Sequence, residues 1–131
     1  MDARIATIRR EGMAALVEGI IQRWFTDDAS MRNAVAVERT RQTLLQTPID
    51  GYIGCCEALR DMDQRADLAR ITAPTLVIAG KFDPAPTPAA AQEWASKIPN
   101  ARFLELPTAH LSNIGAAGEF NQQVLTFLLG E

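Results

Sequence analysis

The chain has 131 residues, of which 47% are hydrophobic and 22% charged, and its formal net charge is -3. A chain of this length can bury enough apolar surface for one modest core, so the composition predicts a packed globular domain. The negative charge gives no support for the dense phosphate contacts of a nucleic-acid-binding protein. No apolar run reaches the roughly 20 residues that cross a bilayer, and the first residues lack a secretory signal, so we expect no membrane partner and a cytoplasmic location.

The two cysteines of the chain, Cys55 and Cys56, are neighbours in the sequence. Neighbouring Cα atoms lie too close for relaxed disulfide geometry, so we expect free thiols, as in a reducing compartment. Two vicinal thiols and a single histidine also offer no spaced set of ligands for zinc or an iron–sulfur cluster. We therefore expect no metal site.

The first half of the chain has the periodicity of helices. Apolar residues recur at three- and four-residue steps from Arg4 to Trp24, which predicts an amphipathic helix that Gly12 and Gly19 could interrupt. A polar-rich helix is expected over residues 31–46, where a following proline ends it, and a third over residues 48–59. No segment of this half has the pattern of a strand.

The second half alternates strands and helices. Residues 75–79 form a short, continuously apolar run that a glycine closes, as expected for a strand buried on both faces. Thr87 and Pro88 fit the N-cap and first position of a helix that continues to residue 98 and packs Trp94 against the sheet. Residues 101–106 predict a second strand, and a last helix is expected to turn Phe120, Val124, Phe127, Leu128 and Ala117 toward the core.

A strand, helix, strand, helix order makes the two strands parallel neighbours in an α/β sheet. Catalytic groups of such sheets gather in the loops at the carboxyl ends of the strands. Asp83 follows the first strand and His110 follows the second. In acyl-transfer hydrolases a histidine takes the proton of a nucleophile, and an acid orients that histidine. We therefore expect the side chains of Asp83 and His110 to be hydrogen-bonded.

The residues around these two positions, Leu76-Val77-Ile78-Ala79-Gly80-Lys81-Phe82-Asp83 and Pro107-Thr108-Ala109-His110, resemble the end of the α/β-hydrolase fold. Three further stretches, at residues 23–26, 51–59 and 109–113, are similar to beta-ketoadipate enol-lactone hydrolases, and this similarity covers essentially all of the chain. The resemblance implies a C-terminal part of that fold, with a helical cap over residues 1–50 and the core, carrying acid and histidine, over residues 51–131.

The chain departs from that family in lacking a nucleophile. It has three serines, Ser30, Ser96 and Ser112, and none of them lies in a G-x-S-x-G sequence. That sequence and the loop that supplies an oxyanion-hole N–H precede the acid in α/β-hydrolases. Ser112 is too close to His110 in the chain to replace a serine at a strand-to-helix turn. No complete triad can be assembled from these residues.

Each candidate residue also has a structural interpretation. Asp83 precedes a proline, and such an aspartate often bonds to its own backbone in a turn. His110 could be a structural histidine, and Trp24 could either line a substrate pocket from the cap or pack in the core. Arginines on the first helix, Arg9, Arg10 and Arg23, could bind an acidic substrate, but solvated helix faces carry arginines as well.

Together these observations predict part of a serine hydrolase. The resemblance implies hydrolysis of a small enol-lactone or other carboxylic ester in aromatic-compound degradation, with no cofactor, and inactivity of this chain by itself. The partner would be a missing N-terminal half or another copy of the chain, bound through an exposed sheet edge. The alternative is a non-catalytic binding or assembly module, or one subunit of a split hydrolase.

Overall fold

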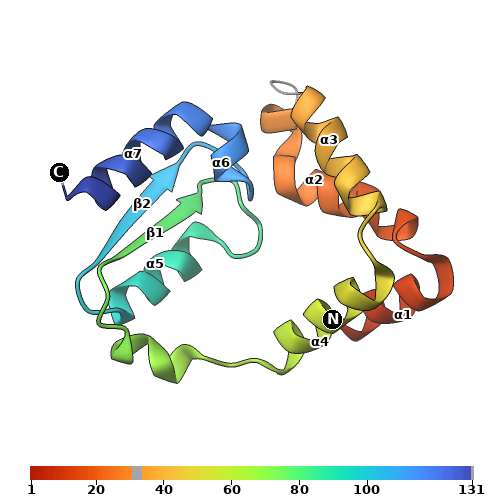
Figure 1. The fold of residues 1–131 in the computed structure, drawn as a ribbon, viewed down its shortest axis with the longest axis horizontal. Coiled ribbons are helices and arrows are strands. Elements are labelled where there is room, and N and C mark those ends of the chain that lie inside the picture. Colours follow the sequence, from red (N-terminus) through yellow and green to blue (C-terminus); the bar gives the residue numbers. More distant parts are fainter. Residues whose placement is uncertain (31–33, 131) are drawn as a thin grey trace.

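A computed structural model describes residues 1–30 and 34–130 and places a helical N-terminal part beside a C-terminal α/β part (Figure 1). The order of elements predicted from the sequence is confirmed, with a 3-10 helix and the four-residue helix α6 in addition. The elements are α1 (Asp2–Glu11), α2 (Ala14–Ser30), α3 (Ala34–Leu45), α4 (Ile49–Asp61), the 3-10 helix η1 (Arg65–Arg70), β1 (Thr75–Gly80), α5 (Pro88–Lys97), β2 (Ala101–Leu106), α6 (Ser112–Gly115) and α7 (Ala117–Leu129).

The first predicted helix is divided in two at Gly12. This residue has a φ of 76°, and its N–H donates to the carbonyl of Ile8 over 2.8 Å. A residue in the left-handed region cannot continue a right-handed helix, so α1 ends there and α2 begins two residues later. Gly19 lies within α2 and does not interrupt it.

Two apolar clusters hold the helical part together. The first joins α1 to α4, and the second joins α2 to α3. Leu111 and Ile114, which follow β2 in the sequence, pack against the second cluster, so the helical and α/β parts share apolar contacts. The buried members of the clusters are Ile5, Ile8, Met13, Ile53 and Cys56 in the first, and Val17, Ile20, Ile21, Phe25, Val37 and Leu44 in the second.

The predicted boundary between cap and core, at residue 50, lies in the first turn of α4. Because α4 packs against α1, the whole of this helix lies with the helical part of the structure. The extended segment that leads to the α/β part follows Asp61. The assignment of the helical part as a cap stays a prediction.

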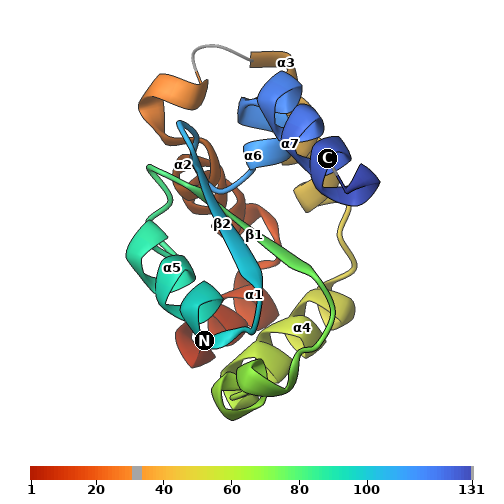
Figure 2. The same cartoon turned by 90° about the vertical axis from the view of Figure 1, so that its left-hand side faces the viewer.

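The sheet consists of β1 and β2, which run parallel, with Thr75 opposite Ala101 and Gly80 opposite Leu106. Helices α5 and α7 lie on opposite faces of it (Figure 2). The predicted start of α5 is confirmed, because the Thr87 hydroxyl accepts the N–H of Ala90 over 3.3 Å. This arrangement brings the loops after both strands to the same end of the sheet.

Four burial predictions for the α/β part are wrong. In β1 only Ala79 and Gly80 are buried, whereas a strand covered on both faces was expected. Leu128 is 71% exposed, Trp94 is 38% exposed and Ala117 is also exposed, although all three were expected to pack inward. The physical reason is the small size of the sheet, because two strands offer too little surface to cover α5 and α7 completely.

Candidate active site

The loops that follow β1 and β2 are joined by backbone hydrogen bonds. The N–H of Lys81 donates to the carbonyl of Leu106 over 2.8 Å, and that of Phe82 donates to Thr108 over 2.9 Å. This close approach requires a glycine at position 80. A Cβ atom on Gly80 would lie 2.0 Å from the carbonyl oxygen of Ala109, far inside van der Waals contact. The two loops therefore fix each other's position.

Asp83 is held by both of its carboxylate oxygens. Oδ1 accepts the N–H of Ala85 over 2.9 Å, which is the turn expected of an aspartate before proline. Oδ2 lies 2.7 Å from Nδ1 of His110. Asp83 thus makes the turn and the contact with His110 at the same time, because the turn orients the carboxylate toward the histidine.

His110 is fixed by groups from two other parts of the chain. Its Nδ1 faces the carboxylate of Asp83, so Nδ1 carries the proton of this hydrogen bond. Its backbone N–H donates to the carbonyl of Trp24 over 3.1 Å, and its ring stacks on the indole with centroids 5.5 Å apart and planes inclined by 20°. Among the residues that the structure describes, none is hydrogen-bonded to Nε2 of His110, which leaves this nitrogen able to accept a proton.

Asp83, His110 and Trp24 line a common cavity of about 550 Å³. This is the size of a small-molecule site. The structure therefore brings together the three site residues predicted from the sequence, although their roles stay predictions. The remaining lining comes from the first residues of the chain, from α2 and α4, and from the loop after Asp83: Met1, Arg4, Arg23, Tyr52, Cys55, Cys56, Leu59, Pro84, Ala85 and Pro86.

Sequence reasoning missed Arg4 and Tyr52 as part of this cavity. They meet where α1 packs on α4, and Arg4 Nη1 donates to the Tyr52 hydroxyl over 3.4 Å. Of the arginines considered from the sequence, Arg23 also lines the cavity, whereas Arg9 pairs with a glutamate on the exposed surface of α4. Helical periodicity does not distinguish these arginines, because only the packing of the helices decides which of them reaches the cavity.

The serines offer no nucleophile beside His110. Ser112 is buried, and its hydroxyl lies 2.9 Å from that of Thr108. The hydroxyl of Ser96 donates to a backbone carbonyl on α5, outside the cavity. The side chain of Ser30 lies outside the described residues. Ser112 is thus a structural residue that holds the turn before α6.

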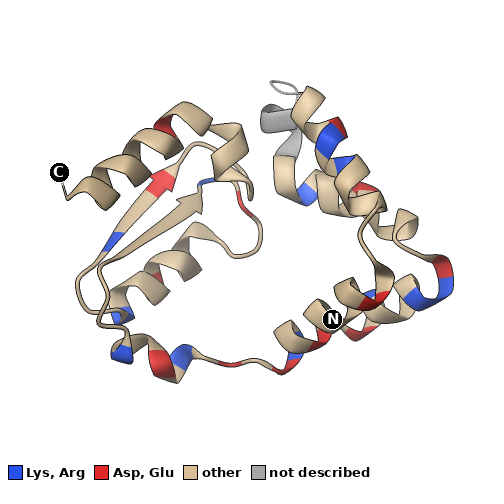
Figure 3. Ribbon diagram, in the orientation of Figure 1, with Lys and Arg blue, Asp and Glu red and all other residues tan. Residues whose placement is uncertain are grey.

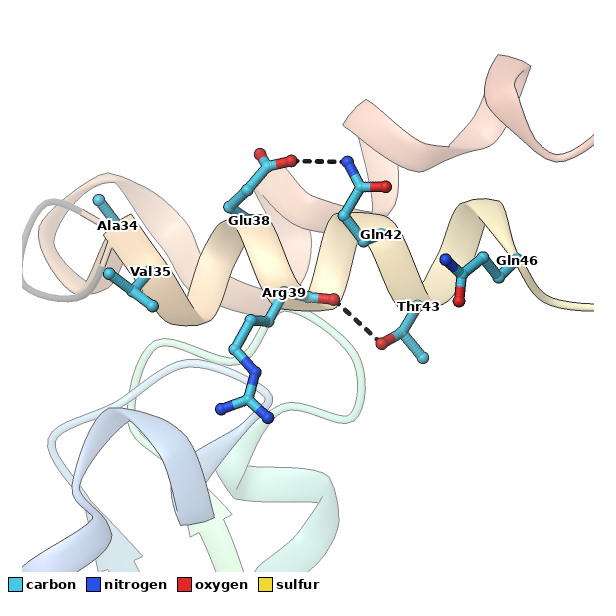
Figure 4. A pocket seen from close by; sticks show the side chains of 7 residues that line it. All are labelled: Ala34, Val35, Glu38, Arg39, Gln42, Thr43 and Gln46. Carbon is cyan, nitrogen blue, oxygen red and sulfur yellow. Dashed lines mark hydrogen bonds between the residues drawn. The ribbon is translucent and has the colours of Figure 1, made fainter.

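Another hollow, of about 580 Å³, lies along the exposed side of α3 and is lined by residues of this helix and its C-terminal end alone (Figure 4). Two of its polar side chains are paired within the helix, since Gln42 donates to Glu38 and the Thr43 hydroxyl donates to the carbonyl of Arg39. It shares no residue with the cavity around His110. Within residues 1–30 and 34–130, no helix is long and apolar enough to cross a membrane, and no three potential metal ligands converge.

Comparisons with known proteins identify chains of similar sequence and fold. No family model matches the chain. It is 36% identical over 121 residues to 3-oxoadipate enol-lactonase 1 of Acinetobacter baylyi, a match that covers 92% of this chain and 46% of that protein. The structure of the enol-lactonase of Burkholderia xenovorans LB400 superimposes with a TM-score of 0.93 and 39% identity, over 97% of this chain and 49% of that one. A thermophilic esterase of Thermogutta terrifontis superimposes with a TM-score of 0.90 and 25% identity.

This chain has the fold of the C-terminal part of an α/β-hydrolase. It spans about half the length of 3-oxoadipate enol-lactonases 1 and 2 of Acinetobacter baylyi. In α/β-hydrolases the catalytic acid and histidine follow the nucleophile in the chain. Asp83 and His110 stand in that order, at the positions where the fold gathers catalytic groups.

Proposed function

We propose that this chain supplies the acid and the base of an α/β-hydrolase active site, and that a serine outside the 131 residues supplies the nucleophile. The observation that carries the proposal is the 2.7 Å contact between Asp83 Oδ2 and His110 Nδ1 at the wall of a cavity. A carboxylate that fixes Nδ1–H leaves Nε2 to take the proton of the serine hydroxyl. The serine oxygen then attacks the ester carbonyl, and the protonated His110 gives the proton to the leaving oxygen.

The substrate that we propose is an enol-lactone of aromatic-compound degradation, or a similar small carboxylic ester. Similarity to enol-lactonases over nearly the whole chain supports this assignment. So does the volume of the cavity, which is suited to a small molecule. The reaction needs no cofactor, because serine, histidine and aspartate form the acyl-enzyme, and a water that gives its proton to His110 then releases the acid and restores the serine hydroxyl. The two free thiols fit a reducing cytoplasm.

The partner that we propose is an N-terminal α/β-hydrolase half, which would extend the sheet beside β1. The two strands differ in charge, and this difference supports β1 rather than β2 as the strand that pairs with the partner. β2 exposes the charges of Arg102 and Glu105, which guard an edge strand against pairing, whereas β1 has no charged residue (Figure 3). Among the described residues β1 pairs with β2 alone. An uncharged, unpaired edge and partly exposed apolar side chains are features of an interior strand of a larger sheet.

The test is the turnover of enol-lactone and of p-nitrophenyl acetate by this chain mixed with an N-terminal hydrolase half that carries G-x-S-x-G. We expect turnover by the mixture, loss of at least about 10³-fold with His110→Ala, and a similar loss with Asp83→Ala. Ser112→Ala and Ser96→Ala are matched controls that keep turnover. Equal turnover with His110→Ala would contradict the proposal.

The lack of G-x-S-x-G in the sequence favours a second candidate, a binding or assembly module that is not catalytic. Such a module would still bind small lactones or a hydrolase half, but His110→Ala would leave any turnover of the mixture unchanged. Turnover by the chain alone would exclude both candidates in their present form, because it would require a nucleophile within these residues.

A further inference from the structure

His110 makes three distinct contacts, and two of them are with one residue of the helical part. Asp83 holds Nδ1, the carbonyl of Trp24 accepts the backbone N–H, and the indole of Trp24 stacks on the imidazole ring. Trp24 is separated from His110 by most of the chain, so this contact exists only because α2 packs against the segment after β2. It is the one aromatic stack among the described residues.

A single hydrogen bond does not fix the plane of an imidazole. The terminal torsion of histidine has a broad energy well, so the ring could pivot about the Nδ1 contact and move Nε2 sideways. A stacked indole removes this freedom, because a tilt of the imidazole would drive its edge into the neighbouring ring. The centroids lie 5.5 Å apart and the planes are inclined by 20°, which is the geometry of an offset stack.

The indole itself is well anchored. Trp24 is half-buried and packs against the cluster of apolar residues that joins α2 to α3, next to the buried Phe25. A side chain held in this way loses little further entropy when it orders a second ring against it. The face of an indole also attracts a cation, and the imidazole becomes cationic when Nε2 takes a proton.

We propose that Trp24 is a positioning residue, which holds the imidazole plane of His110 so that Nε2 faces the nucleophile and which stabilises the imidazolium after proton transfer. The proton moves from the hydroxyl of the nucleophile to Nε2, and the positive charge then lies on a ring that is stacked with the indole. The catalytic part of this inference rests on the proposed function, whereas the ordering of His110 by Trp24 does not. In this way packing of α2 against the α/β part assembles the base.

The ordering is tested by NMR on the whole chain, whose single histidine gives an unambiguous ring signal. We expect the Hδ2 and Hε1 resonances of His110 to lie upfield of those of an unstructured histidine, because the indole shields them. Trp24→Leu moves them downfield and raises the mobility of the ring, while Trp24→Phe keeps part of the shielding. Trp94→Leu is the matched control, since Trp94 lies on α5 and outside the cavity, and it changes neither property.

Two results would overturn the ordering. One is unshielded ring protons in the unsubstituted chain, a measurement that does not depend on whether any variant folds. The other is a folded Trp24→Leu chain in which both the ring shifts and the ring mobility are unchanged. Retained shielding in Trp24→Phe, together with loss in Trp24→Leu, supports stacking rather than a general effect of the core.

The catalytic part is tested in the mixture with a G-x-S-x-G half. A cation held over an indole gains enough energy for Trp24→Leu to lower kcat about 3- to 30-fold, with a smaller change in KM and partial recovery in Trp24→Phe. A rise in KM with unchanged kcat would instead make Trp24 a wall of the substrate cavity and overturn the positioning role. No turnover even with the unsubstituted chain would refute the proposed function, while the NMR result would still decide the ordering of His110.

Discussion

Replacement of Gly80 by alanine tests whether the close approach of the loops after β1 and β2 holds the site in place. The added Cβ would lie 2.0 Å from the carbonyl oxygen of Ala109 and 2.7 Å from that of Thr108, and both are backbone atoms that no side-chain rotation can move away. Normal contact between carbon and oxygen needs more than about 3 Å, so the loop before His110 must shift by roughly 1 Å. Overpacking of this kind costs about 1–3 kcal/mol of unfolding free energy.

The same shift would also move His110 away from Asp83, because Ala109 directly precedes His110. A displacement of that size is enough to break the 2.7 Å contact between Asp83 and His110. We therefore expect Gly80→Ala to lower the melting temperature measured by circular dichroism by about 4–12 °C. The ring resonances of His110 should shift at the same time, even at temperatures where the chain is folded.

Gly54→Ala is the matched control. Gly54 lies within α4, and a Cβ atom there would meet nothing within 4 Å. Alanine is the better helix former by about 0.5–1 kcal/mol, so this variant should melt higher than the unsubstituted chain. A melting temperature and His110 spectrum of Gly80→Ala equal to those of the unsubstituted chain would refute the reasoning from close approach.

Three further outcomes are expected. Leu128→Lys should reduce self-association of the isolated chain in sedimentation velocity, because Leu128 lies with the exposed Leu125 and Leu129 in one apolar patch of α7. Val35→Lys, at a similarly exposed residue of α3 outside that patch, should not reduce it. A chain that is monomeric at high concentration would contradict the exposed-interface argument. Thr87→Ala removes the cap of α5 and should cost about 1 kcal/mol in urea unfolding, and no loss would mean that the cap hydrogen bond does not form in solution. The hydrogen bond from Arg41 lowers the pKa of Glu18. The stabilisation by this pair is therefore present above the ordinary glutamate pKa of about 4.3 and is lost as pH falls through the lowered value. The difference in melting temperature between the unsubstituted chain and E18Q should shrink in acid, and a constant difference would show that the pair is not formed.

Local sequence signals were sufficient for most of the elements. Thr87 and Pro88 mark the start of α5 by satisfying helix N-terminal groups, and the uncharged run of β1 marks a strand. The contact between Asp83 and His110 could also be predicted, because a parallel pair of strands brings the loops at their carboxyl ends together. Each of these inferences needs only neighbouring residues and one topological rule.

The burial of side chains could not be predicted from local sequence signals. The apolar face of α7 predicted that Leu128 lies inward, but a periodic pattern shows which side of a helix is apolar and does not show what covers that side. The same holds for β1, whose apolar sequence indicates an interior strand although only two of its residues are buried in this chain. The sequence therefore shows that β1 and α7 have apolar surfaces, and the described residues leave these surfaces partly exposed.

Long-range packing alone decided the rest of the site. The stack of Trp24 on His110, the contact of Arg4 with Tyr52 and the approach of Gly80 to Ala109 each join segments that come together only when the elements pack. No local pattern encodes such contacts, since helix phase and strand register leave the relative placement of two elements free. The sequence by itself determined the elements and the two chemical groups, and tertiary packing decided how His110 is held, because that depends on surfaces distant in the chain.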